Sequence, residues 1–433
     1  MIAQFIFLII AIAAIAFFTW NVRKIIRNIQ LGRPLNRSDR PAERFWLLVK
    51  IAFGQTKMTK RPIAALLHFF VYAGFIIINL EVLEIIIDGL LGTHRIFASP
   101  LGGLYNVLIG SFEILAALVL IGVIAFYARR NFLKLRRFSG VEMTKWPLSD
   151  ANNILIIETL LMIAFLTMNA ADSRLQQMGS AHYISAGIFP VSSLLAPWLP
   201  ASESALIFIE RSAWWFHIVG ILAFLNYLPY SKHFHIIMAF PNTYYSNLEP
   251  KGEFTDMTSV TNEVKAMLDP AFTPEPVAEG GRFGAKDVQD LTWKNLMDAY
   301  TCTECGRCTS VCPANLTGKL LSPRKIMMDT RDRLTEVGKN INLHGKDYTD
   351  GKSLLNDYIS AEEIWACTTC NACTEACPIN IDPLSIIVEL RRYSVMEESQ
   401  APASLNNMFG NVENNGAPWK YSPADRFNWA DNN

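Results

Sequence analysis

The eight cysteines of this chain are the side chains whose type and spacing most directly indicate a chemistry. They form two runs with one pattern, Cys-x2-Cys-x2-Cys-x3-Cys-Pro, which begin at Cys302 and Cys367. Three thiolates on a tight loop can each bind one iron of a cubane, and a more distant cysteine completes the ligand set. In runs of this type the fourth cysteine ligates the other cluster. The pattern therefore predicts two neighbouring [4Fe–4S] clusters between which electrons can pass.

The crossed pattern gives every cysteine a predicted ligand role. The first cluster is expected to take three ligands from one run and the last from the other: Cys302, Cys305, Cys308 and Cys377. The second cluster is expected to take the complementary set: Cys367, Cys370, Cys373 and Cys312. The alternative, structural zinc, usually takes its ligands as two separated pairs. Two complete runs without a surplus cysteine leave little room for it.

Hydrophobic residues make up 51% of the 433-residue chain and are concentrated before position 240. Five segments there are long and apolar enough to span a bilayer: Ile2–Trp20, Pro62–Ile87, Leu104–Tyr127, Ile154–Ala171 and Ala205–Leu228. Backbone groups in lipid must be satisfied within the segment, so we expect helices. The first segment lacks a basic n-region and a small-residue cleavage site, and is therefore expected to be an anchor rather than a signal peptide. The formal net charge of zero gives no indication of a nucleic-acid partner.

Basic residues predict how these helices are oriented. Segments 21–61 and 128–151 contain 11 and 6 Lys or Arg, whereas 88–100 and 172–204 contain one each. By the positive-inside rule, the N-terminus lies outside and the chain after the fifth helix lies in the cytoplasm. We therefore expect a multi-pass protein of the bacterial inner membrane. Because the cytoplasm is reducing, its cysteines should bind metal rather than form disulfides.

Four histidines in the membrane half are candidate haem ligands: His68, His217, His233 and His235. Ionisable residues inside a membrane are costly and are functional candidates by default. A neutral imidazole whose other ring nitrogen is hydrogen-bonded is a good axial haem ligand. The alternative for each is a structural histidine. We expect that structural role for three others: His94, His182 and His344.

Depth in the bilayer predicts which histidines pair. Counted from the basic residues at the cytoplasmic boundary, His68 lies about 10 Å deep and His217 about 22 Å, whereas His233 and His235 lie within about 5 Å. His68 therefore suits His235, or His233, better than His217. On one continuous helix His217 and His235 would be about 27 Å apart, so they could serve two haems but not share one. The prediction is one haem b, with two possible.

Acidic residues also occur where lipid would reject them. Glu81, Glu84 and Asp88 form an i, i+3, i+7 stripe at the outer end of the second helix. Such a stripe could carry protons to or from a quinone, which takes up two protons with two electrons. Structural pairing with Arg95 or Arg211 is the alternative. Three further carboxylates lie near helix ends or interiors: Glu113, Glu158 and Glu210.

Residues 60–240 resemble the cytochrome b subunit of respiratory nitrate reductase and the related membrane subunit of heterodisulfide reductase. The resemblance is carried by Phe216-His217-Ile-Val-Gly and by the segment Tyr227–Ile236. In that family a pair of fifth-helix histidines ligates two haems with two histidines of the second helix. This chain offers only His68 in the second helix, and Ile78 stands where the other is expected. The resemblance thus implies that His68 pairs with His235 and leaves the outer haem without a complete pair.

Residues 287–433 are similar to the dicluster segment of heterodisulfide reductase and anaerobic glycerol-3-phosphate dehydrogenase iron–sulfur subunits. The similarity extends past the cysteines through Asn411–Trp419 and Arg426–Trp429. In fused relatives such a segment leads into cysteine-rich domains of the CCG type. Since this chain has no ninth cysteine, the resemblance implies that a module of this kind is a separate polypeptide.

These observations predict a mainly α fold, a five-helix transmembrane cytochrome b bundle followed by an α-helical dicluster ferredoxin domain. The expected divisions are a haem b domain at 1–240, a linker at 241–286, a cytoplasmic ferredoxin domain at 287–397 and an extended arm at 398–433. Within the linker we expect one short helix at Ser259–Leu268, and within the ferredoxin domain a helix over Ser322–Leu334.

The predicted function is electron transfer within a quinone-linked oxidoreductase. Electrons would pass between menaquinone or another quinone, haem b and the two clusters, and then to or from a cytoplasmic partner. That partner is expected to be a CCG-type iron–sulfur subunit or an electron-transfer flavoprotein on a separate chain. A different hypothesis is that the membrane half serves only as an anchor and assembly platform for a soluble-type iron–sulfur protein.

Overall fold

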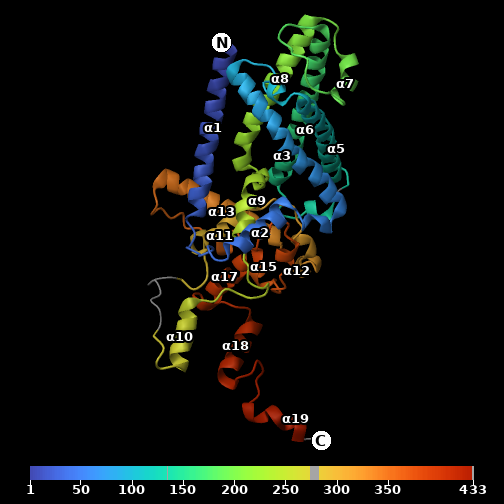
Figure 1. Cartoon of the computed structure of the whole chain (residues 1–433). Coiled ribbons are helices and arrows are strands. Elements are labelled where there is room, and N and C mark those ends of the chain that lie inside the picture. Colours follow the sequence, from blue (N-terminus) through green and yellow to red (C-terminus); the bar gives the residue numbers. More distant parts are fainter. Residues whose placement is uncertain (134, 274–281, 432–433) are drawn as a thin grey trace.

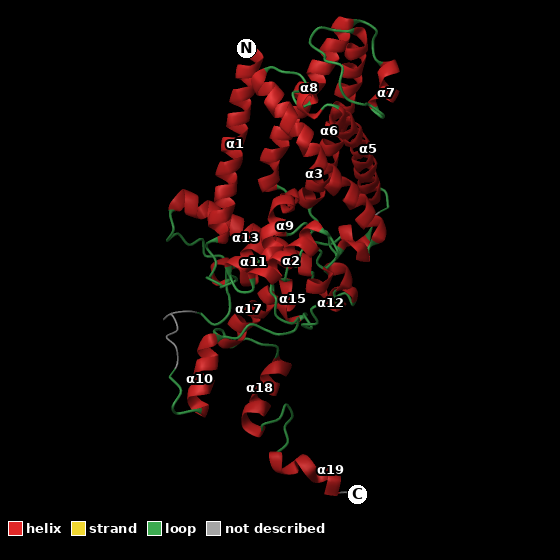
Figure 2. Ribbon diagram, in the orientation of Figure 1, coloured by secondary structure: helices red, strands yellow, loops and turns green. Residues whose placement is uncertain are grey.

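The computed structural model describes residues 1–133, 135–273 and 282–431. Figure 2 shows that the described part consists of helices and loops, without a β-strand. A bundle of long helices stands on a compact region that contains the cysteines (Figure 1). The mainly α-helical prediction is confirmed. The compact region at residues 282–397 is called the cysteine region. The end of the helix bundle that contacts it is called the cysteine end, and the opposite end of the bundle is called the far end.

Five helices are long and apolar enough to cross a membrane. They are α1 (Ile2–Ile29), α3 (Pro62–Leu91), α5 (Gly103–Asn131), α6 (Lys145–Met178) and α8 (Glu203–Tyr227). The five predicted spans are confirmed, and each helix runs beyond the predicted segment at one end or both. Proline at the first position of α3 has its φ already set for a helix and no N–H left unbonded. That helix ends at Gly92, whose φ of 74° suits a residue without a Cβ.

The fifth long helix stops earlier than the spacing of its histidines suggested. Helix α8 ends at Tyr227, and a 3₁₀ turn over Leu228–Tyr230 follows. Pro229 cannot donate a backbone hydrogen bond, so the α-helical pattern cannot continue through it. The Ser231 side chain then accepts a hydrogen bond from the His233 backbone and begins a new turn, and α9 (His235–Tyr244) follows. The predicted end of the fifth span at Leu228 is thus confirmed to within one residue, and His235 begins a separate helix. The separation of about 27 Å between His217 and His235 assumed one helix and does not apply to this arrangement.

The cysteine region is a set of short helices around one apolar core. Its principal helices are α11 (Trp293–Thr301), α13 (Pro323–His344), α15 (Ala361–Trp365) and α17 (Pro383–Met396). Side chains bond their first turns, as Thr292 does for α11 and Asp382 for α17. Fully buried aliphatic residues such as Leu296, Ile326 and Ile386 form the core, which includes two of the cysteines. The cysteine loops are thus fixed by packing.

The remaining helices are short or lie at the periphery. They are α2 (Pro41–Leu48), α4 (Ala98–Leu101), α7 (Ser192–Leu195), α10 (Thr258–Leu268), α12 (Pro313–Leu316), α14 (Leu354–Asp357), α16 (Ala372–Ala376), α18 (Ala403–Asn415) and α19 (Asn428–Asp431). The two helices predicted at 259–268 and 322–334 are confirmed as α10 and α13, and α13 extends ten residues beyond its predicted end. Helices α10 and α18 bury no residue, and α18 and α19 extend away from the compact region (Figure 1). The predicted linker begins inside α9, and its residues 274–281, like 432–433 of the arm, lie outside the described residues.

Buried polar contacts join the membrane bundle to the cysteine region. Arg33, just after α1, exchanges backbone hydrogen bonds with Leu291 and Trp293 at 2.7 and 3.1 Å. Glu142, in the loop between α5 and α6, forms a 2.7 Å ion pair with Arg324 of α13. Both side chains are almost fully buried. Buried charge pairs of this kind fix the relative position of two elements, because separating them would leave a charge without a partner.

This ion pair allows a stability prediction. Arg324→Met should leave the Glu142 carboxylate buried without its cation and lower the free energy of unfolding by about 3–5 kcal/mol. Chemical denaturation of the detergent-solubilised protein, followed by circular dichroism, measures the loss. In the double variant Glu142→Leu/Arg324→Met most of it should return, because no uncompensated charge remains. Equal destabilisation in both variants would show that the pair itself is not responsible.

Candidate metal centres

Four cysteines from both runs line one small cavity in the cysteine region. They are the predicted ligands of the first cluster: Cys302, Cys305, Cys308 and Cys377. The other walls are mostly apolar, with Met327, Ile379 and Pro383 among them. Cys377 thus lies with the first run although 68 or more residues separate it from each of those cysteines. This donor set suits a cubane whose fourth ligand comes from the other run.

The two cysteine loops have the same backbone conformation. In the first loop Glu304 and Gly306 have φ of 53° and 69°, and in the second Thr369 and Asn371 have 55° and 58°. Each pair stands two and four positions after the first cysteine of its run. Left-handed residues on both sides of the second cysteine curl the chain into a tight loop. The repeated spacing therefore produces a repeated shape.

The second set of cysteines contains one exposed thiol. Cys367 interacts electrostatically with Cys312 and Cys370, so the last cysteine of the first run lies near the second run. The backbone N–H of Thr369 bonds the sulfur of Cys367 at 3.4 Å. Cys312 and Cys373 are buried, whereas Cys370 is exposed. The second site thus reaches the surface of the protein at Cys370.

The electrostatics of the first site favour an anionic group with bound iron. Burial raises the pKa of the thiols of Cys302 and Cys377 to about 12, so a nearby cation is needed to keep them ionised. Positive side chains surround the site: Arg307 interacts with Cys305 and Cys377, and Lys57 interacts with Cys377. Within the described ranges, no three His, Cys, Asp or Glu side chains are grouped to hold a single metal ion. The four thiols with cations beside them therefore suit a bound iron–sulfur cluster, as the cysteine pattern predicts.

Three of the four candidate haem histidines lie together at the cysteine end. The rings of His233 and His235 are 5.4 Å apart. Both histidines interact electrostatically with His68. His217 lies elsewhere: it is 1% exposed, packs 5.7 Å from Phe165 and shares a 3.0 Å hydrogen bond with the carbonyl of Leu161. The structure thus brings His68 to His233 and His235 and not to His217.

Hydrogen bonds distinguish the members of this group. Nδ1 of His68 bonds the side-chain oxygen of Gln55, and Nδ1 of His235 bonds the carbonyl of Lys232, both at 3.0 Å. The Nε2 atoms of these two rings are left for another ligand, and both side chains are only half-buried. In His233 it is Nε2 that faces a partner, Glu158 of α6 at 3.3 Å. His68 and His235 are therefore the two histidines whose Nδ1 bonds orient the ring and leave Nε2 as a candidate axial ligand.

The histidine group adjoins the first cysteine loop. Arg307, which lies between Cys305 and Cys308, acts electrostatically on His68. Its guanidinium also donates a 3.2 Å hydrogen bond to the carbonyl of Lys57, in the loop before α3. On the same loop Glu304 pairs with Lys232, three residues before His235. The first cysteine run is thus attached to the two segments that carry His68 and His235.

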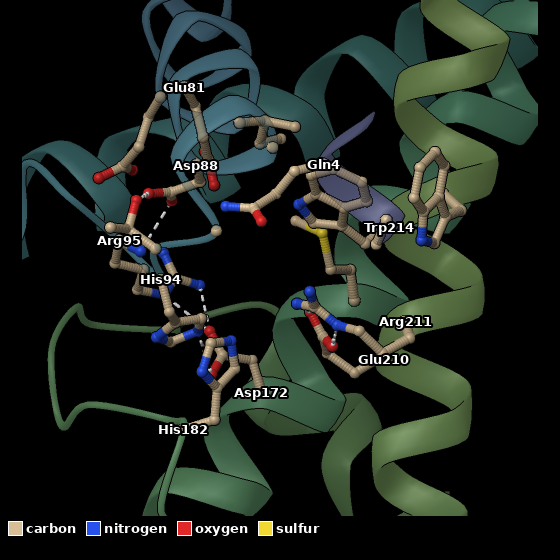
Figure 3. A pocket seen from close by; sticks show the side chains of 18 residues that line it. Gln4, Glu81, Asp88, His94, Arg95, Asp172, His182, Glu210, Arg211 and Trp214 are labelled. Carbon is tan, nitrogen blue, oxygen red and sulfur yellow. Dashed lines mark hydrogen bonds and ion pairs between the residues drawn. The ribbon is translucent and has the colours of Figure 1, made fainter. Parts of the chain in front are cut away.

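A polar pocket occupies the far end of the bundle, where α1, α3, α6 and α8 meet (Figure 3). Asp172 lies between the His94 ring, at 3.2 Å, and the Arg95 guanidinium, at 2.6 Å. His182 also lines this pocket, and its ring is 5.7 Å from that of His94. The third histidine expected to be structural, His344, stacks on Tyr348 in the cysteine region.

The acidic stripe of α3 reaches this pocket, but most of it has structural partners. Glu84 accepts hydrogen bonds from Tyr105 and from the backbone of Phe97, both at 2.8 Å. Asp88 accepts the backbone N–H of Arg95 at 2.8 Å. Glu81 differs, because its buried Oε2 atom has no hydrogen-bond partner in the part of the chain that the structure describes, and the residue is 3% exposed. Only Glu81 of the stripe therefore remains a candidate for proton exchange.

Two residues of the two sites were not found from the sequence: Gln55, which bonds His68, and Asp172, which pairs with Arg95 in the far pocket. Glu158, which faces His233, was singled out as a carboxylate inside a span, but its partner was not predicted. Gln55 carried no signal, because a glutamine before a helix is an ordinary loop residue.

Comparison with known proteins agrees with the cysteine geometry. Residues 301–381 match the family model described as a 4Fe-4S dicluster domain. The match covers both cysteine runs and the helices between them. The chain therefore carries a dicluster domain for two [4Fe–4S] clusters.

The chain is also homologous over most of its length to iron–sulfur oxidoreductases. It is 30% identical to the probable iron-sulfur-binding oxidoreductase FadF of Bacillus subtilis, over 98% of this chain and 60% of that protein. It is 28% identical to the EtfAB:quinone oxidoreductase of Syntrophomonas wolfei, over 92% of this chain and 55% of that protein. A third relative, from Methanosarcina acetivorans, is one of the subunits of a ferredoxin/F420H2-dependent CoB-CoM heterodisulfide reductase. It is 35% identical, over 24% of this chain and 52% of that relative.

The chain thus spans about 60% of the length of FadF and 55% of that of the EtfAB:quinone oxidoreductase. No solved structure matches it. The fold and the comparisons together define a class: a helical membrane protein with a 4Fe-4S dicluster domain, related to iron–sulfur oxidoreductases.

Proposed function

We propose that this chain is the electron-transfer subunit of a quinone-linked oxidoreductase. In this proposal His68 and His235 bind one b-type haem, and the crossed cysteine sets bind the two clusters. When bound, these groups carry single electrons, and the protein positions them and tunes their potentials. The observation that carries the proposal is the direct attachment of the first cysteine run to the segments of His68 and His235.

The order of the sites supports a route from the bilayer to solvent. The histidine group lies at the cysteine end of the bundle, and the first cysteine site adjoins it through Arg307. The second site contains the exposed Cys370, which favours contact with a soluble partner. The excess of basic residues in the loops at this end supports a cytoplasmic position in a bacterial inner membrane.

The chemistry of the substrate is proposed to occur at a centre other than the two clusters. These two clusters would use all eight cysteines of residues 1–433. The similarity to a heterodisulfide reductase subunit favours a CCG-type partner, and that to an EtfAB:quinone oxidoreductase favours an electron-transfer flavoprotein. The latter similarity also supports a quinone, menaquinone or another, as the substrate in the membrane. Glu81 remains a proposed site of proton exchange in the membrane half.

The proposal can be tested with the purified full chain in lipid nanodiscs. A reduced menaquinol analogue should reduce both a b-type haem, seen in the visible spectrum, and the clusters, seen by EPR. In the matched control His217→Ala this reaction should persist, because His217 is outside the His68 group. Dithionite supplies the fully reduced reference for every sample.

Two results would contradict the proposal. Absence of a b-type band in the dithionite-reduced protein would favour the alternative that the membrane half only anchors an iron–sulfur protein. A haem that responds to dithionite but exchanges no electron with either the quinol or the quinone would contradict the quinone link.

A further inference from the structure

Four arginines converge on one pocket at the cysteine end of the bundle: Arg61, Arg129, Arg136 and Arg137. They come from the residue before α3, the last turn of α5 and the turn that follows it. Most of the remaining wall is apolar, formed by Pro62, Ile63, Ala64 and Leu135, and Ser310 completes it. The pocket thus combines a concentrated positive charge with an apolar surface.

The positive charge has no protein counter-ion in the described part of the chain. None of these arginines forms an ion pair with an Asp or Glu of residues 1–133, 135–273 and 282–431. Arg61, Arg307 and Arg129 act on Arg137 as like charges. In addition, Nε of Arg137 is buried and has no hydrogen-bond partner among the described residues. Like charges held together in this way repel one another unless an anion binds between them.

The level of the pocket along the bundle indicates which anion it binds. Helix α3 begins at Pro62 and α5 ends at Asn131, so the arginines lie where the apolar spans meet water. Ile63, one residue into the span, is 64% exposed. The positive-inside rule accounts for basic residues at this end, but not for their convergence on an apolar pocket from three elements. A ligand with a phosphate and a hydrocarbon part would match both surfaces.

We propose that this pocket binds the headgroup of an anionic phospholipid, with the arginines on its phosphate and the acyl chains along the outer surfaces of α3 and α5. Guanidinium groups suit this role because they bind phosphate in a bidentate manner. Ser310, which accepts a 2.7 Å hydrogen bond from Arg61, lies within the first cysteine run. A bound lipid would therefore connect the bilayer to the cluster loop. This inference does not depend on the proposed function.

The test measures lipid retention by the full chain. The protein is released from nanodiscs of equimolar phosphatidylglycerol and phosphatidylcholine and analysed by native mass spectrometry. Arg129→Gln/Arg136→Gln removes two charges from the pocket, and neither side chain bonds another residue in the described part of the chain. Its apparent affinity for phosphatidylglycerol should fall about 30-fold, which corresponds to about 2 kcal/mol for two arginines at the membrane surface.

The matched control is Arg23→Gln/Lys50→Gln, which removes two exposed basic charges near the same boundary but outside the pocket. It should retain phosphatidylglycerol as the unaltered chain does. Equal loss in the control would show diffuse surface attraction and overturn the proposal, as would full retention by the pocket variant. Displacement of the lipid by millimolar inorganic phosphate would assign the site to free phosphate instead. If the glutamine variant loses its iron, Arg129→Lys/Arg136→Lys, which keeps the charge, should retain iron and most of the lipid.

Discussion

Cys377→Ala is expected to remove the first cluster, although Cys377 belongs to the second run. The reason is geometric, because Cys377 lines the same cavity as Cys302, Cys305 and Cys308. A cubane that loses one of four thiolates in a buried site should not persist, so the iron content should fall by about half. Iron analysis and EPR of the reduced protein measure the loss.

Reference variants make this prediction specific. Cys305→Ala should remove the first cluster and Cys370→Ala the second, which gives a spectrum for each loss. The spectrum of Cys377→Ala should match that of Cys305→Ala, and the spectrum of Cys312→Ala should match that of Cys370→Ala. If Cys377→Ala instead matched Cys370→Ala, each run would hold its own cluster and the crossed assignment would be wrong.

The cysteine sites could be predicted from the sequence because their information is local. Three ligands of each cluster lie within seven residues, and the two runs impose the same loop with left-handed residues at matching positions. The five long helices were equally accessible, since twenty or so apolar residues have few alternatives in lipid. What the sequence could not provide were the partners that depend on where separate helices end.

The far pocket illustrates this limit. Asp172, His94 and Glu210 are distant in sequence and meet only because α3, α6 and α8 end at the same level. The stripe of Glu81, Glu84 and Asp88 was visible as a sequence pattern. Two of its members are structural, because backbone N–H groups of the loop at 95–97 donate hydrogen bonds to Asp88 and Glu84. By contrast, the break after Tyr227 had a signal in Pro229, which disfavours a continuous helix to His235. The predicted span accordingly ends at Leu228, one residue beyond the end of α8.

The second large effect is expected for His68→Ala, which should abolish the b-type haem band. Loss of one axial imidazole leaves the iron with a single protein ligand, and His235→Ala should have the same result. His233→Ala is the closest control, because its ring adjoins His235 but its Nε2 faces Glu158. That variant should keep its haem, as should His217→Ala. Unchanged cluster EPR in all four variants would show that the fold is retained. Haem loss in His233→Ala with retention in His235→Ala would move the ligand role to His233, and an unchanged band in His68→Ala would return His68 to a structural role.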